Sequence, residues 1–232
     1  MATGKRVASA VGGTLAPKLV GLAPAATAGV VRQALHRAIV GVGPLAGAAA
    51  AAEKRLDDRD GDLDRTIREL IESHVAYAGA GGFVTNLGGL VTTAVALPAS
   101  VTGLALIQSR MVAAIAHLRG YDLDDPRTRN AVLETLLGRD KVDRAVKAER
   151  LPAPPMALAT APAHDPEIDR RVAAEVASEL VGRVAGRRLA TTLGRKVPIV
   201  GGVVGAGADG LATYQVGRYA RAELLPRPRP IR

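Results

Sequence analysis

Five polar residues stand out because they lie in or beside stretches that otherwise carry almost no charge. They are Gln108, Arg110, Lys196, Asp209 and Arg218. Asp209 is the one acidic residue between Glu179 and Glu223, and a carboxylate in apolar surroundings is costly unless it is paired. Arg110, or Lys196 and Arg218, could supply that pairing. Asp209 is then either a structural ion pair or helix cap, or a functional carboxylate in a polar pocket with Gln108 and Arg110.

A second candidate for chemistry is the stretch 205–210, which matches the dinucleotide-binding pattern G-x-G-x-x-G. That pattern works between a strand and a helix, with a further strand and an acid about 20 residues later. Only 22 residues remain after Gly210, and Glu223 is the sole later acid, so the unit has no room. We expect a Gly-rich helical segment instead, in which Gly201 and Gly205 permit close helix packing.

The acidic stretch 57–64 resembles a calcium-binding loop. With Gly61 at position 6 of such a loop, Leu56 and Ile67 fall at positions 1 and 12. Those positions need an Asp and a bidentate Glu, so two main ligands are missing. The stretch is better explained as a solvated acidic turn that caps the following helix.

The remaining side chains give little support for catalysis. The chain has no cysteine, and its four histidines are scattered without the spacing of metal ligands. His74 and His117 flank the main apolar region and could approach each other. We expect no metal and no cofactor. An enzyme that uses Asp209, Gln108 and Arg110 remains as one alternative.

The elements that must position these residues are helices, because aromatic residues make up only 2% of the chain while Ala and Gly dominate it. Residues 75–109 form a run of 35 without a charge. A bilayer span needs about 20 apolar residues, so one straight pass would be long enough. The glycines and Pro98 favour two shorter helices joined at Gly88–Gly89 or near Pro98. A second Gly-rich hairpin is expected over 197–217, which makes the fold an all-α helical bundle with two Gly/Ala-rich apolar helical hairpins.

The domain boundaries follow from composition. Residues 1–27 are predicted to be a flexible basic arm, 28–224 a helical domain, and 225–232 a disordered basic tail. Five prolines within 150–166 predict an exposed linker inside the domain. Asp125, Pro126 and Gly138 predict the cap, first turn and end of a short helix.

The net charge of +9 is concentrated at the two ends of the chain. Residues 1–52 carry five Lys or Arg and no acid, and residues 181–232 carry ten basic residues and two acidic ones. Basic ends suit phosphate, either in nucleic acid or in anionic lipid head groups. The aromatics needed to stack bases are missing, so we expect no specific nucleic acid partner. No convincing signal peptide is present, since Lys18 interrupts a Gly/Ala-rich stretch, and we expect the chain to stay inside the cell.

Four blocks of the sequence resemble the EcsC family of bacterial proteins. They are 78–98, 108–111, 114–138 and 196–220, and the resemblance covers about residues 30–224. It implies a fold, and it implies that several residues fall on the family's motif positions: Gly82, Phe83, Pro98, Gln108, Arg110, Gly120, Gly201, Gly202 and Asp209. The family is named after a protein encoded beside the subunits of an ABC transporter. This implies a membrane transporter as one partner to consider.

These patterns favour a membrane-associated helical accessory or scaffold protein. Its apolar hairpins would insert into lipid or pack together, and its basic ends would bind anionic lipid at the inner face of the cell membrane. It would be cytoplasmic and either peripheral or partly inserted, and it could self-assemble. The alternative is a soluble helical protein whose hairpins enclose an apolar pocket for a lipid or another hydrophobic ligand, because an Ala/Gly-rich surface suits either setting.

Overall fold

The fold of the chain is all-α in a computed structural model that describes residues 27–42, 45–87, 93–193 and 198–228. Within these residues, side chains are described except at 42–45, 81–102 and 184–206. A helix over 27–40 leads into a two-residue antiparallel bridge, β1 (Gly41–Val42) with β2 (Leu45–Ala46). The helices that follow are α2 (Ala48–Asp57), α3 (Leu63–Leu87), α4 (Thr93–Leu118), α5 (Pro126–Thr135), α6 (Arg139–Lys147), α7 (Pro155–Ala159), α8 (Pro166–Leu193) and α9 (Pro198–Glu223). The predicted all-α fold class is confirmed.

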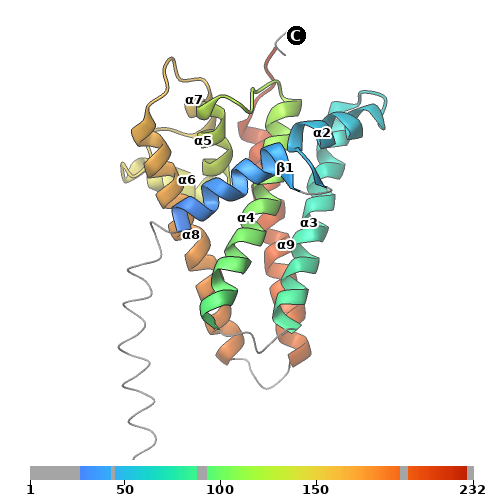
Figure 1. The fold of residues 1–232 in the computed structure, drawn as a ribbon, viewed down its shortest axis with the longest axis vertical. Helices are drawn as coiled ribbons and strands as arrows, with labels where there is room; N and C mark the ends of the chain where they lie inside the picture. Colours follow the sequence, from blue (N-terminus) through green and yellow to red (C-terminus); the bar gives the residue numbers. More distant parts are fainter. Residues whose placement is uncertain (1–26, 43–44, 88–92, 194–197, 229–232) are drawn as a thin grey trace, which may run out of the picture.

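Four long helices, α3, α4, α8 and α9, extend together along the long axis of the molecule (Figure 1). The last turns of α3 and α8 and the first turns of α4 and α9 lie at one end, which we call the hairpin pole. The helices α5 and α7 and the C-terminal residues lie at the opposite pole. Among the described residues, no helix is both long and apolar enough to cross a membrane.

The first predicted hairpin is present, but the prediction of a second hairpin within 197–217 is wrong. In the first, α3 and α4 are separate helices on either side of residues 88–92, and Pro98 lies inside α4. The second hairpin is instead made by α8 and α9, because the stretch 198–217 belongs to a single helix that runs on to Glu223. The G-x-G-x-x-G stretch lies within this helix, so it is not a turn between a strand and a helix.

Helix α4 forms the centre of the bundle and packs against α2, α3, α5, α8 and α9. All six residues from Met111 to Ala116 are buried, as expected for a helix that is surrounded by others. Gly217 lets α9 approach closely, since a Cβ there would lie 2.9 Å from Ile71 of α3 and 3.1 Å from the sulfur of Met111. The centre is therefore packed so closely that it has no room for one additional methyl group at this position.

Local signals set several of the helix ends. Asp125 accepts a hydrogen bond from the backbone N–H of Arg127 and so caps α5, with Pro126 in the first turn. The acidic turn is a cap as well, because Asp62 accepts from the backbone N–H of Arg65 at 2.9 Å. Both interpretations made from the sequence are confirmed.

Two segments that were expected to be loose are partly packed. Within 150–166, α7 packs on α5, and Leu151, Pro155 and Leu158 are buried, so the segment differs from an exposed linker. At the start of the predicted tail, the backbone N–H of Arg227 donates to Arg119 at 2.8 Å. The Tyr121 hydroxyl donates to the carbonyl of Leu225 at 3.0 Å. The predicted arm falls almost wholly on residues 1–26, outside the described residues.

Candidate functional site

Buried polar side chains from three helices meet in the middle of the bundle, in what we call the polar layer. Its members are His74 of α3, Gln108 and Ser109 of α4, and Asp209 and Thr213 of α9, each at most 8% exposed. They lie on the hairpin side of the apolar centre at Met111. Polar groups are costly in such a place unless they are hydrogen-bonded, so their positions call for an explanation.

Gln108 joins α4 to α9 directly. Its side-chain amide nitrogen donates to the hydroxyl of Thr213 at 3.2 Å, and both residues are fully buried. The Gln108 carbonyl oxygen and the Ser109 hydroxyl find no hydrogen-bond partner among the described atoms. A buried group left in this state costs about 1–3 kcal/mol, so the layer holds polarity that the described packing does not satisfy.

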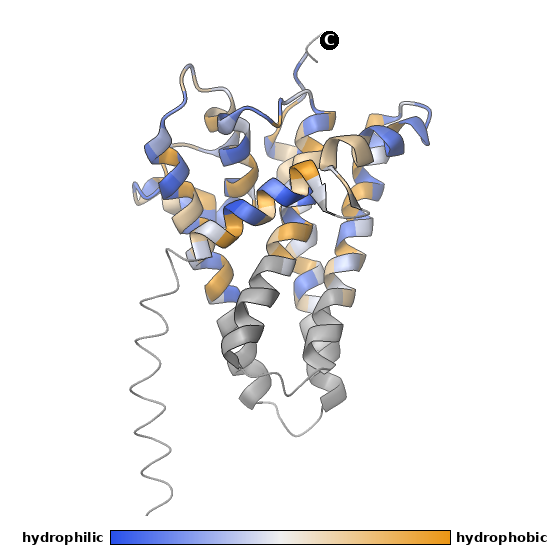
Figure 2. Ribbon diagram, in the orientation of Figure 1, coloured by the Kyte–Doolittle hydropathy of each residue, from blue (hydrophilic) through white to orange (hydrophobic). Residues whose placement is uncertain are grey.

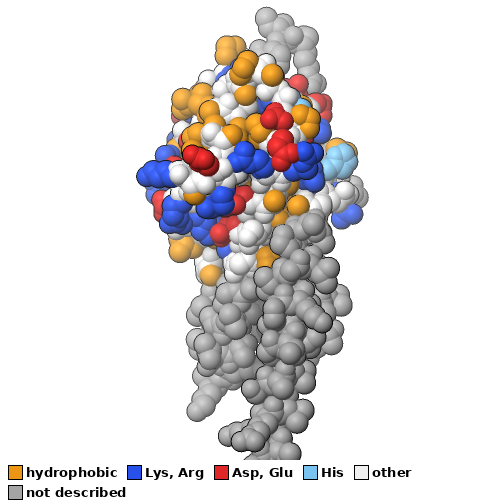
Figure 3. Space-filling model, turned by 90° about the vertical axis from the view of Figure 1, so that its left-hand side faces the viewer, with side chains coloured by type: hydrophobic (Ala, Val, Ile, Leu, Met, Phe, Trp, Pro, Cys, Tyr) orange, Lys and Arg blue, Asp and Glu red, His pale blue; other side chains and the backbone are white. Residues whose placement is uncertain are grey.

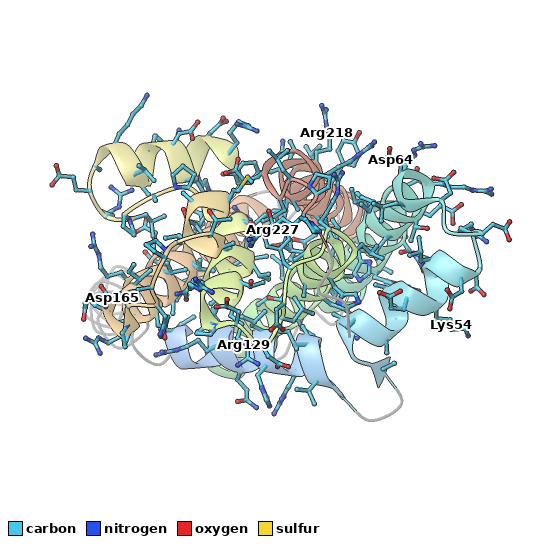
Figure 4. All side chains as sticks on the ribbon, turned by 90° about the horizontal axis from the view of Figure 1, so that it is seen from above. Lys54, Asp64, Arg129, Asp165, Arg218 and Arg227 are labelled. Carbon is cyan, nitrogen blue, oxygen red and sulfur yellow. The ribbon has the colours of Figure 1, made fainter. Side chains whose placement is uncertain are left out.

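Asp209 faces the same seam as Gln108, because it precedes Thr213 by four residues, which is about one turn of α9. Arg218 lies nine residues further along, which at about 100° per residue places it on the opposite side of the helix. Its guanidinium stacks over the ring of Tyr214 at 5.9 Å and points outward (Figure 4). Lys196 lies outside the described residues. The structure thus brings Gln108 and Asp209 to one seam and places Arg218 elsewhere.

Arg110 is half-buried and lies beside Tyr77 of α3 rather than on the seam with Gln108. Burial lowers the pKa of its guanidinium below the ordinary value, and the nearby Tyr77 acts in the opposite direction. Among the described side chains, Arg110 makes no hydrogen bond or ion pair. The proposed pocket of Gln108, Arg110 and Asp209 is therefore split between two sides of α4.

The two histidines expected near each other make separate contacts. His74 donates from Nδ1 to the carbonyl of Leu70 at 2.8 Å and meets the edge of Tyr77. Burial lowers the pKa of His74 to about 4, and the positive charges of Arg110 and Arg55 add to this effect. His117 instead lies 2.6 Å from a carboxylate oxygen of Glu53 on α2. His74 is therefore neutral at pH 7.

The sequence analysis missed Glu134 of α5, whose side chain is fully buried with neither carboxyl oxygen hydrogen-bonded in the described structure. Burial raises the pKa of Glu134 to about 9, and the negative charge of Glu223 contributes to the rise. The carboxyl is therefore protonated at pH 7, which avoids a bare charge in the core. A signal was present, since Glu134 stands between the apolar pairs Val132–Leu133 and Leu136–Leu137.

No set of three His, Asp or Glu side chains close enough to hold a metal ion occurs among the described residues. One open hollow of about 320 Å³ lies near the start of the C-terminal tail. It is lined by Leu56, Gly61, Leu63, Leu118, Arg119, Pro226 and Arg227. Two arginines and an open mouth do not suit an apolar ligand, and Figure 4 shows Arg227 over the centre of this end of the bundle.

The fold and the polar layer define a class: an all-α protein built from two long helical hairpins, one of which supplies the central buried helix α4. The sequence profile of the EcsC protein family matches residues 24–227, and the chain belongs to this family. No curated protein and no solved structure matches the chain.

Proposed function

We propose that this protein binds the inner face of the cell membrane by inserting its hairpin pole into one leaflet. The observation that carries the proposal is the separation of charge along the molecule. Residues 75–109 and 189–194 carry no charge, and no acidic residue occurs between Glu179 and Asp209. On the face shown in Figure 3, the described body carries Lys and Arg mixed with Asp and Glu, and Figure 2 shows hydrophilic residues among hydrophobic ones in its helices.

Exposed tyrosines stand where the body meets this pole. Tyr77 of α3 is 60% exposed and Tyr214 of α9 is 44% exposed. Gly210 of α9 contacts Val75 of α3, so Tyr77 lies about 3 Å nearer the hairpin pole than this level and Tyr214 about 6 Å further from it. Tyrosine prefers the boundary between hydrocarbon and head groups, where its ring is buried and its hydroxyl stays wet. Tyr77, the nearer of the two to the pole, therefore marks the expected depth of insertion, and Tyr214 lies on the head-group side of it.

The length beyond Tyr77 matches one leaflet, whereas the length beyond Tyr214 exceeds it. At about 1.5 Å per residue, the helices extend about 15 Å from Tyr77 to the end of α3 and about 24 Å from the start of α9 to Tyr214. A hydrocarbon core is about 30 Å thick, so one leaflet supplies about 15 Å.

Positive charge accompanies the pole. Arg187 and Arg188 lie in the last two turns of α8, and Arg195 and Lys196 follow in the sequence. A cation on an inserted helix end is costly unless its long side chain extends to the head groups, where each charge favours anionic lipid by about 1 kcal/mol. Self-association and a transporter partner remain predictions without a described contact behind them.

Flotation of the purified chain with liposomes tests the proposal. The wild type is expected to float on vesicles with and without anionic lipid and to stay bound at high salt, because apolar insertion is not screened. Tyr77→Asp with Tyr214→Asp, which adds two negative charges, should lose flotation, whereas Gln33→Asp with Ala222→Asp, which adds the same charge at exposed positions of the body, should retain it. Binding that disappears at high salt would mean adhesion by charge alone, and no flotation at all would overturn the proposal.

A further inference from the structure

The strongest unexplained charge at the level of the exposed tyrosines is Arg110. It is the first charged residue after the 35 uncharged ones, and its guanidinium is half-buried. It forms neither an ion pair nor a hydrogen bond with the described side chains. A partly dehydrated cation is costly without a counter-charge, so the site calls for an anion.

The surroundings of Arg110 add to the positive field. The positive charges of Arg110 and Arg55 both lower the pKa of His74 on α3, so two guanidiniums lie within electrostatic range of one imidazole. Arg55 is held in place from α2, where it donates to the carbonyl of Glu69 at 3.1 Å and to the Ser73 hydroxyl at 2.8 Å. His74 itself is neutral at pH 7. No acidic side chain shifts the pKa of Arg110 or that of His74.

The position of this corner matches the depth of a lipid phosphate. Arg110 is close enough to Tyr77 for the two side chains to interact electrostatically, and Tyr77 is the exposed aromatic that marks the boundary between body and pole. In a bilayer the phosphate groups lie just outside the hydrocarbon, at the level that tyrosine side chains prefer. Arginine binds phosphate through two parallel N–H groups, a geometry that lysine cannot reproduce.

We infer that Arg110, with Arg55 and Tyr77 around it, forms a site for the phosphate of an anionic phospholipid at the rim of the hairpin pole. The inference rests on the proposed function and deepens it, because it assigns recognition of the head group to one side chain. Insertion of the hairpins would provide attachment to any bilayer, and Arg110 would provide the preference for anionic lipid.

The test compares vesicle affinities of variants on phosphatidylcholine alone and on phosphatidylcholine with phosphatidylglycerol. Arg110→Gln should bind zwitterionic vesicles as the wild type does and lose at least tenfold in affinity for anionic ones. Arg110→Lys should recover little of this loss. Arg218→Gln, at the exposed ring of Tyr214, should lose no more than about fivefold, the effect of one cation near an anionic surface. Arg68→Gln on the body should change nothing.

The outcomes separate the two proposals. If the wild type binds both kinds of vesicle equally, insertion stands and the phosphate site is overturned. The site is also overturned if Arg110→Lys binds like the wild type, or if Arg110→Gln loses no more than Arg218→Gln. Competition by millimolar inorganic phosphate that removes the anionic preference would show a site for free phosphate instead of lipid. If the wild type binds neither kind of vesicle, the proposed function itself fails.

Discussion

At the scale of single residues, the polar groups that matter most are those buried between the helices. The sequence singled out Gln108 and Asp209 because they interrupt apolar stretches, and both are buried on one seam. The sequence could not show which helix Arg110 faces. Two residues along α4 turn a side chain by about 200°, so Arg110 faces away from Gln108, and its neighbour is known only once the helices are packed. Glu134 was missed because a helical acid is ordinarily exposed.

Glu134 should make the protein less stable as the pH rises. Its pKa of about 9 in the folded state lies above the ordinary value of 4.5, so folding takes up a proton between these values. The free energy of unfolding should fall by about 1.4 kcal/mol per pH unit across that range. In Glu134→Gln this slope should be largely lost, as measured by urea unfolding at pH 5 to 9.

The control for Glu134 is Glu72→Gln, which changes an exposed acid on α3. It should keep the slope of the wild type. An unchanged slope in Glu134→Gln would mean that the carboxyl is ionised in the folded protein.

His74 should act in the opposite sense at acid pH. Its folded pKa of about 4 lies below the ordinary value of 6.5, so the unfolded chain binds a proton that the folded chain rejects. The contribution of neutral His74 to the free energy of unfolding is complete above pH 6.5 and is lost as the pH falls towards 4. Thermal unfolding of His74→Gln should show a shallower fall in Tm between these values. His36→Gln, an exposed histidine, should follow the wild type, and equal acid sensitivity in both variants would contradict the assignment.

At the scale of helices, the helical periodicity and the capping residues could be predicted from the sequence, but which helices pack against each other could not. The cap at Asp125 and the break between α3 and α4 follow from local chemistry that any chain obeys. The second hairpin was misplaced, because the Gly-rich stretch 197–217 was expected to turn back on itself, while 198–217 lies inside one helix. The prolines of 150–166 also mislead, since Pro155 starts the short helix α7 and is buried.

The close approach of α9 to its neighbours gives a prediction at this scale. In Gly217→Ala the new methyl group would meet Ile71 at 2.9 Å and Met111 at 3.1 Å, which should cost about 1–3 kcal/mol of stability. Gly182→Ala on α8 has nothing within 4 Å and should gain up to about 1 kcal/mol from helix propensity. Denaturant unfolding of both variants checks this, and equal effects would rule out tight packing at Gly217.

At the scale of the whole molecule, the hairpin pole, where the ends of α3 and α4 carry no charge and the end of α8 carries Arg187 and Arg188, lies opposite the pole of α5 and α7 (Figure 1). If the hairpin pole enters lipid, amide hydrogen exchange should slow within 79–87, 93–107 and 198–207 when anionic vesicles are added. The reason is that backbone openings in these turns would expose polar groups to hydrocarbon. Exchange in α5, α6 and α7 should not change. Slowing confined to those three helices would contradict the proposed orientation.

The docking of Arg227 on Arg119 holds the last described residues at the pole opposite the hairpins. A protein fused after the last residue would therefore sit on the far side of the molecule from the lipid. Immobilising the chain through its C-terminus on a sensor surface would present the hairpin pole to the solution. A chain attached through its C-terminus would then capture vesicles with its hairpin pole already facing them.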